Sequence, residues 1–190
     1  MKLLTLLVAL LTIFLVVSCH HETPKPQAYF RIDKQQIHYQ AYENRRFSFS
    51  LPADAKVASE KKGDECWMTI HFPYYKATLY CTYLPVSREK LGAAIDDNFR
   101  MAFSHSVKAN GITQSVLSLP SIQSGGVLYS IEGSVATPRQ FFITDSVAHF
   151  FRASLYFDGK VNADSVAPVL KYMDENIREM LHSFRWKNLK

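Results

Sequence analysis

Hydrophobic and polar residues alternate strictly in the stretch Phe47–Pro52, where Phe47, Phe49 and Leu51 fall on one face. This period of two predicts a half-buried strand, and Pro52 ends it because proline has no amide hydrogen to give to a ladder. Two longer runs with the same period follow at residues 66–72 and 77–84. They predict an antiparallel hairpin that turns at residues 73–75, preceded by a charged turn at residues 60–64.

Further runs predict strands at residues 29–32, 113–118, 126–135, 139–144 and 149–157. The stretch Asp145-Ser146-Val147-Ala148 and the pair Asp158-Gly159 are rich in turn-forming residues. We therefore expect the last two of these strands to form a hairpin, and the chain to turn again after the second one.

Two stretches show the period of a helix. The first follows Ser87, a good N-cap, carries Leu91, Ile95, Phe99, Ala102 and Phe103 along one side, and should stop at Asn110-Gly111. The second has the clearest apolar stripe in the chain, with Pro168 expected in its first turn and Asp164 or Ser165 as its cap. The stripe consists of Val169, Leu170, Met173, Ile177, Met180, Leu181 and Phe184.

Strands, helix, strands and helix in this order predict an α+β fold, in which helices cover an antiparallel β-sheet. The order of elements resembles the PsbP/Mog1-like sandwich. That likeness concerns the fold and carries no statement about function.

The N-terminus is typical of a bacterial lipoprotein precursor. Lys2 precedes an uncharged run from Leu3 to Val17, and Ser18 precedes Cys19, so the pattern resembles a lipobox. We predict a signal peptide at 1–18, acyl chains such as palmitate on Cys19, a Pro-containing tether at 19–28 and one domain at 29–190. The alternative is a plain signal peptide that ends beside a free thiol. The apolar run is too short to span a bilayer comfortably.

Composition and charge exclude several functions. The formal net charge of +5 comes from interspersed basic and acidic residues, which does not favour nucleic-acid binding. No spacing typical of a metal site occurs in the sequence, and we expect no cofactor. Cys66 and Cys81 fall diagonally across the predicted hairpin, so we expect two buried thiols, with a disulfide as the alternative.

The densest polar group lies between Gln140 and Arg152 and has three interpretations. Asp145, Ser146 and His149 would suit a hydrolase, but triad members usually come from distant segments, and Ser146 lacks a Gly-x-Ser-x-Gly elbow. In the second interpretation, which we favour, Asp145 and Ser146 bond to turn amides. In the third, Gln140, His149 and Arg152 form a surface for a partner.

The remaining polar motifs favour no chemistry. His105 and Lys108 suit a solvated helix face, although a ligand role is the alternative. The adjacent carboxylates at positions 96 and 97 would diverge around a helix, and Gly125-Gly126 lacks the context of a phosphate loop. We therefore expect that the protein is not an enzyme and has no small-molecule substrate.

Several motifs together resemble the gliding motility lipoprotein GldD family of the Bacteroidota. The similarity rests on Tyr29-Phe30-Arg31-Ile32, Cys66-Trp67, Phe72-Pro73, Ile131-Glu132-Gly133, Asp164-Ser165-Val166-Ala167-Pro168, Phe184-x-Trp186 and, above all, the run from Pro138 to Phe157. At Gln27-Ala28 the family pattern would have Arg-Gly. The resemblance implies an envelope lipoprotein that serves gliding and type IX secretion, and it transfers no catalytic residue.

Together these observations predict a lipid-anchored accessory or assembly factor that acts through contacts with other secretion or gliding proteins. Only Glu22 is acidic among the residues just after Cys19, which favours a domain that faces the periplasm. The alternative function is a periplasmic hydrolase or small-ligand binder that uses Asp145, His149 and Arg152.

Overall fold

The computed structural model describes residues 37–104, 107–158 and 163–187, which all belong to one compact unit of the chain. The predicted signal peptide, Cys19, the tether and the strand at 29–32 lie outside the described residues. None of the helices in the described part has the length and apolar character needed to cross a membrane.

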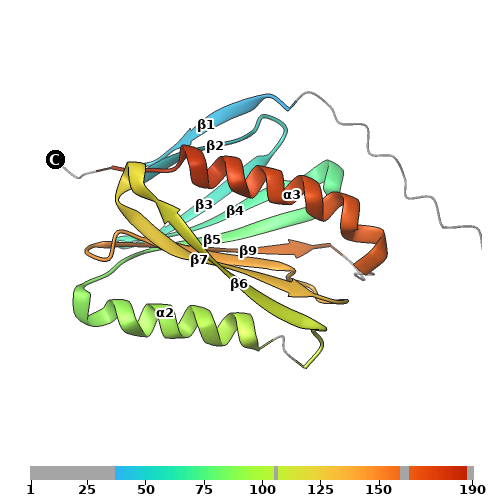
Figure 1. The fold of residues 1–190 in the computed structure, drawn as a ribbon. Helices are drawn as coiled ribbons and strands as arrows, with labels where there is room; N and C mark the ends of the chain where they lie inside the picture. The colour runs from blue at the N-terminus through green and yellow to red at the C-terminus, as the bar shows by residue number, and fades with distance from the viewer. Residues whose placement is uncertain (1–36, 105–106, 159–162, 188–190) are drawn as a thin grey trace, which may run out of the picture. The chain divides into compact units, whose positions relative to one another are not determined.

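A seven-stranded antiparallel sheet forms the centre of this unit, in the order β3-β4-β5-β9-β8-β7-β6 (Figure 1). Its strands are β3 (Lys56–Lys62), β4 (Glu65–Phe72), β5 (Ala77–Pro85), β6 (Gly111–Leu119), β7 (Ser124–Glu132), β8 (Arg139–Thr144) and β9 (His149–Phe157). Tight connections join β3 to β4, β4 to β5, β6 to β7 and β8 to β9. The pairing of β5 with β9 joins the first three strands to the last four.

One face of the sheet is covered by helix α3 (Ala163–Ser183) and a small sheet of β1 (Tyr39–Glu43), β2 (Phe47–Pro52) and β10 (Arg185–Trp186) (Figure 1). The alternation in β2 places Phe47, Phe49 and Leu51 in the main core. The Phe47 ring lies 5.2 Å from that of Phe151 in β9 and 5.5 Å from that of Phe184, between centroids. Burial of each such side chain stabilises the fold by roughly 1.5–3 kcal/mol.

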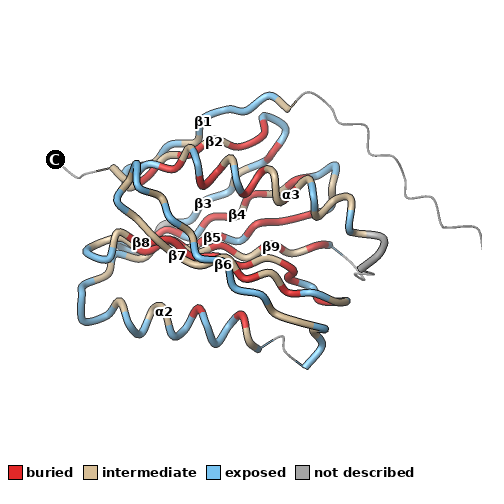
Figure 2. The backbone as a smooth tube through the Cα atoms, viewed as in Figure 1, coloured by how far each residue is buried: buried red, intermediate tan, exposed pale blue. Residues whose placement is uncertain are grey.

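Helix α2 (Arg88–Phe103) packs on the opposite face of the large sheet, where it forms a smaller core (Figure 2). Ala102 meets Tyr129, Phe142 and Phe150 there. Within α2 only Asn98 and Ala102 are buried, and Phe99 is exposed. The helix therefore covers only part of this face.

The α+β class, the strand β2, the β4–β5 hairpin and the hairpin of β8 and β9 are confirmed, as is the apolar stripe of α3. Cys66 pairs with Tyr83 and Met68 pairs with Cys81, so the two cysteines are diagonal, and both are buried thiols that no disulfide joins. The predicted arrangement of these two residues is confirmed.

Several predicted boundaries are wrong. Residues 60–62 belong to strand β3, and the turn is the tight Gly63-Asp64, where Gly63 has a positive φ of 63°. Helix α2 ends at Phe103, well before Asn110. Helix α3 begins at Ala163, so Asp164, Ser165 and Pro168 all lie inside it. Strand β1 was not predicted at all, and β7 ends at Glu132.

Candidate functional site

The turn between β8 and β9 is organised by the side chain of Asp145. Its Oδ1 atom accepts hydrogen bonds from the amides of Val147 (3.0 Å), Ala148 (3.0 Å) and His149 (2.9 Å). Thr144 completes the turn, because its Oγ1 atom donates to the His149 carbonyl (2.7 Å) and accepts from the Ser146 amide (3.0 Å). The turn interpretation is therefore confirmed for Asp145, whereas Ser146 contributes its backbone amide.

His149 joins three elements through its imidazole ring. Its Nδ1 atom lies 2.8 Å from the hydroxyl oxygen of Tyr83 in β5, at hydrogen-bonding distance. The ring stacks on the indole of Trp186 in β10, with centroids 4.9 Å apart and planes inclined by 15°. Trp186 is held in turn by a bond from its Nε1 to the Ser124 hydroxyl in β7 (2.8 Å). The histidine thus ties the two sheets together.

Burial and hydrogen bonding set the protonation of this group. Burial lowers the pKa of His149, the nearby Arg46 lowers it further, and the Asp145 carboxylate raises it only in part, so the net shift is downward. Burial acts to raise the pKa of Asp145, but its three amide donors and His149 outweigh this, and the pKa is lowered. At neutral pH the pair is therefore a neutral imidazole beside an ionised carboxylate.

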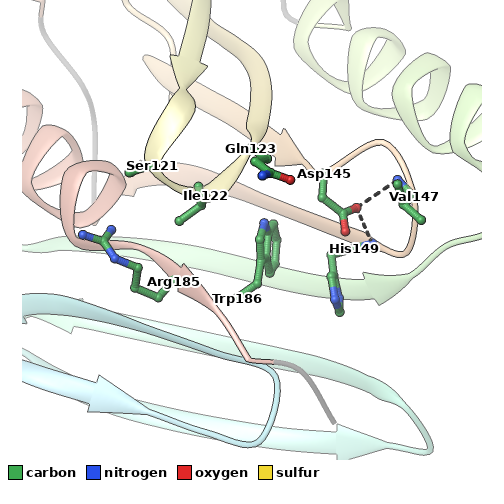
Figure 3. A pocket seen from close by; sticks show the side chains of 8 residues that line it. All are labelled: Ser121, Ile122, Gln123, Asp145, Val147, His149, Arg185 and Trp186. Carbon is green, nitrogen blue, oxygen red and sulfur yellow. Dashed lines mark hydrogen bonds between the residues drawn. The ribbon is translucent and has the colours of Figure 1, made fainter.

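A pocket of about 400 Å³ lies between this turn, the β6–β7 connection and β10 (Figure 3). Asp145, His149 and Trp186 line it, and Figure 3 shows Trp186 standing between Arg185 and His149. The rest of the wall is formed by Ser121, Ile122, Gln123, Val147 and Arg185. Its polar groups differ in charge, because Arg185 is a cation and Asp145 an anion.

The geometry does not assemble a nucleophile and its base. Among the described residues, no hydrogen bond joins Ser146 to His149, and the Nδ1 of His149 is engaged by Tyr83. Asp145 is directed at backbone amides, so it does not orient the imidazole as the acid of a triad would. Within the described ranges, no cluster of side chains suited to a metal ion occurs.

Gln140 and Arg152 do not share this pocket with Asp145 and His149. Strand alternation places Arg152 on the opposite face of the sheet from His149. There its Nη1 lies 3.1 Å from the sulfur of Met101 in α2. Gln140 is 2% exposed, and its Oε1 atom has no hydrogen-bond partner among the described residues. A buried Gln140 cannot contact a partner, so the predicted four-residue surface does not exist as one patch.

Sequence reasoning missed a second pocket, of about 380 Å³, on the part of the sheet that α2 leaves open. Its walls are Tyr80, Thr82, Met101, Arg152, Ser154 and Tyr156. Tyr80 and Trp67 on this face are 52% and 43% exposed. The signal was present in the sequence, because aromatic residues occupy the outward positions of alternating strands, where polar residues are usual. His105 lies outside the described residues, and Lys108 is exposed.

Comparison with known families identifies a match over most of the chain. A family model described as gliding motility lipoprotein GldD matches residues 19–186. No curated protein matches the chain. The family match confirms the resemblance that the sequence motifs indicated, and it begins at Cys19.

Proposed function

The chain belongs to the gliding motility lipoprotein GldD family, and from this premise we propose that it is a lipid-anchored accessory or assembly factor of the cell envelope. It serves gliding motility and type IX protein secretion through contacts with other proteins of that apparatus. The observation that carries the proposal is the family match over residues 19–186, which starts at the cysteine of the lipobox pattern.

We infer that acyl chains on Cys19 hold the protein at an envelope membrane, with the domain in the periplasm. Each buried methylene contributes about 0.8 kcal/mol, and a single chain binds only marginally. Two or three chains on one residue would make the attachment effectively permanent. The Pro-containing tether predicted at 19–28 would then give the domain reach from the membrane surface.

The proposal also holds that the protein is not an enzyme. The polar side chains that suggested chemistry are occupied in other ways: Asp145 holds a turn, and His149 bonds to Tyr83 and stacks on Trp186. These contacts are those of a structural junction. They favour a role in which the domain presents a fixed surface.

The open part of the α2 face is a suitable contact surface, and its aromatic and basic composition is common at protein interfaces. Tyr80 and Tyr156 meet edge to face with centroids 5.4 Å apart, beside Arg152 and Met101.

Helices on both faces of an antiparallel sheet also support the PsbP/Mog1-like sandwich, which we propose as the fold.

Gene deletion and complementation test this function. We expect a deletion strain to lose colony spreading, if the host glides, and to release less cargo of the type IX system. The wild-type gene should restore both, and a Cys19→Ala gene should not, although its protein accumulates. A deletion strain whose secreted proteins and motility are unchanged would contradict the proposal.

A further inference from the structure

Strand β6 forms one edge of the large sheet. It pairs with β7 at nine consecutive positions, from Gly111 opposite Glu132 to Leu119 opposite Ser124, without a bulge. In the part of the chain that the structure describes, no strand pairs with its other side. A long, regular edge of this kind is a template for another strand.

The two edges of the sheet are protected to very different degrees. Strand β3, at the opposite edge, contains Lys56, Glu60 and two further lysines. Strand β6 has the sequence GITQSVLSL, which contains neither a charge nor a proline. Residues 113–116 are all exposed, and Val116 is 87% exposed. The devices that normally keep an edge from pairing are therefore present in β3 and missing from β6.

The direction of the free backbone groups follows from the ladder. The amide of Ile131 in β7 donates to the carbonyl of Pro138, towards β8. Because successive residues alternate in direction, the neighbours of Ile131 along β7 direct their amides towards β6. The β6 residues opposite these neighbours direct their backbone N–H and C=O groups towards β7. The β6 residues between them direct these groups outward, away from the sheet. The outward set is Ile112, Gln114, Val116 and Ser118.

We propose that β6 pairs antiparallel with β6 of a second copy of this chain, about a two-fold axis at Ser115. This register is the one that overlaps the whole strand, and it also sets outward residues opposite outward residues. Gln114 then faces Val116, and Ile112 faces Ser118, so that each pair can exchange two hydrogen bonds. No charged residue meets another across the axis.

Because the β6 edge is complementary to itself, a second copy of the chain is the partner strand that fits it. A two-fold interface needs one surface that fits itself, and the β6 edge meets that condition in both backbone direction and side-chain charge. A membrane anchor on Cys19, as proposed above, would raise the local concentration of copies. The pairing itself does not depend on the proposed function.

Cysteine substitution at the axis tests the register directly. In the pair, Ser115 faces its own counterpart at a Cα separation of about 4.5 Å, which suits a disulfide. Thr113 lies about 14 Å from its counterpart, because four residues at about 3.4 Å separate the two positions. Both residues are exposed, so Thr113→Cys is a matched control for Ser115→Cys.

The full-length variants are made in the protein's own cells, oxidised in intact membranes and separated without reductant. We expect a species of twice the mass from Ser115→Cys and none from Thr113→Cys or the wild type. Adding Val116→Pro should abolish it, because proline removes an outward amide that β7 does not use. Unchanged protease resistance of that double variant would show that it folds.

The proposal would be overturned by the absence of a dimer from Ser115→Cys, by equal crosslinking from Thr113→Cys, or by a disulfide to a protein of different mass. A dimer that persists with Val116→Pro would also contradict it, since random collision would then explain the crosslink. None of these results depends on motility or secretion, so they leave the proposed function to its own test.

Discussion

Replacing His149 with alanine should lower the free energy of unfolding by about 2–4 kcal/mol. The change leaves the hydroxyl of Tyr83, a residue that is 0% exposed, without its 2.8 Å partner. An unsatisfied buried polar group costs about 1–3 kcal/mol. The ring also stacks on Trp186, and loss of an aromatic pair adds about 0.5–1.5 kcal/mol.

A double-mutant cycle with Tyr83→Phe isolates the hydrogen bond. Tyr83→Phe removes the hydroxyl but leaves His149 beside the pocket, where water can replace the partner, so it should cost only about 0.5–1.5 kcal/mol. The double variant should cost less than the sum of the single changes, with a coupling of about 1 kcal/mol. Urea unfolding followed by tryptophan fluorescence gives these values, because Trp186 reports on the junction.

The structural role of His149 would be refuted by a specific combination of results. If His149→Ala unfolds at the wild-type urea concentration while secretion or spreading is lost, the side chain acts on a ligand or substrate. The hydrolase alternative would then be favoured. A His149→Ala protein that is destabilised but still functional at permissive temperature would instead support the structural role of His149.

Three further changes have defined outcomes. Burial lowers the folded-state pKa of His149 below its usual 6.5, so the unfolded chain binds the proton more readily than the folded protein. The free energy of unfolding should therefore fall as the pH drops below about 6.5. In urea titrations at several pH values, His149→Ala should flatten this dependence. Gln140→Met removes a buried acceptor without a partner, so thermal unfolding should show no loss, or a gain of up to about 1 kcal/mol. Gly126→Ala would set its Cβ 1.9 Å from a backbone carbonyl oxygen of β8, so we expect little folded protein in a solubility assay. The control is Gly92→Ala in α2, which has open space around it and should fold normally.

The sequence predicted those strands whose buried faces alternate cleanly. The bounds of β8 and β9 were predicted as observed, because Asp145 and its neighbours mark the turn between two strongly apolar runs. Strands β1 and β3 were missed, because both are largely exposed and each packs only one hydrophobic side chain on the core, Tyr42 or Val57. What makes β3 a strand is its ladder with β4, which is a tertiary effect that local composition does not reveal.

The candidate site was predicted only in its local part. The bonds of Asp145 connect residues that are close in sequence, so turn chemistry was sufficient to expect them. The partners of His149 lie 66 residues away in β5 and in the C-terminal strand β10, and no local pattern indicates them. The separation of Arg152 from His149 follows from strand parity, since the two positions differ by an odd number.

The proposed tethered assembly factor is tested most directly by crosslinking and co-purification of the membrane-anchored protein from its own cells. We expect secretion or gliding proteins to be recovered with the wild type and to be lost with Cys19→Ala, because the unanchored domain does not reach the apparatus. Recovery of none of these proteins with the lipidated form, at normal abundance, would contradict the proposed function.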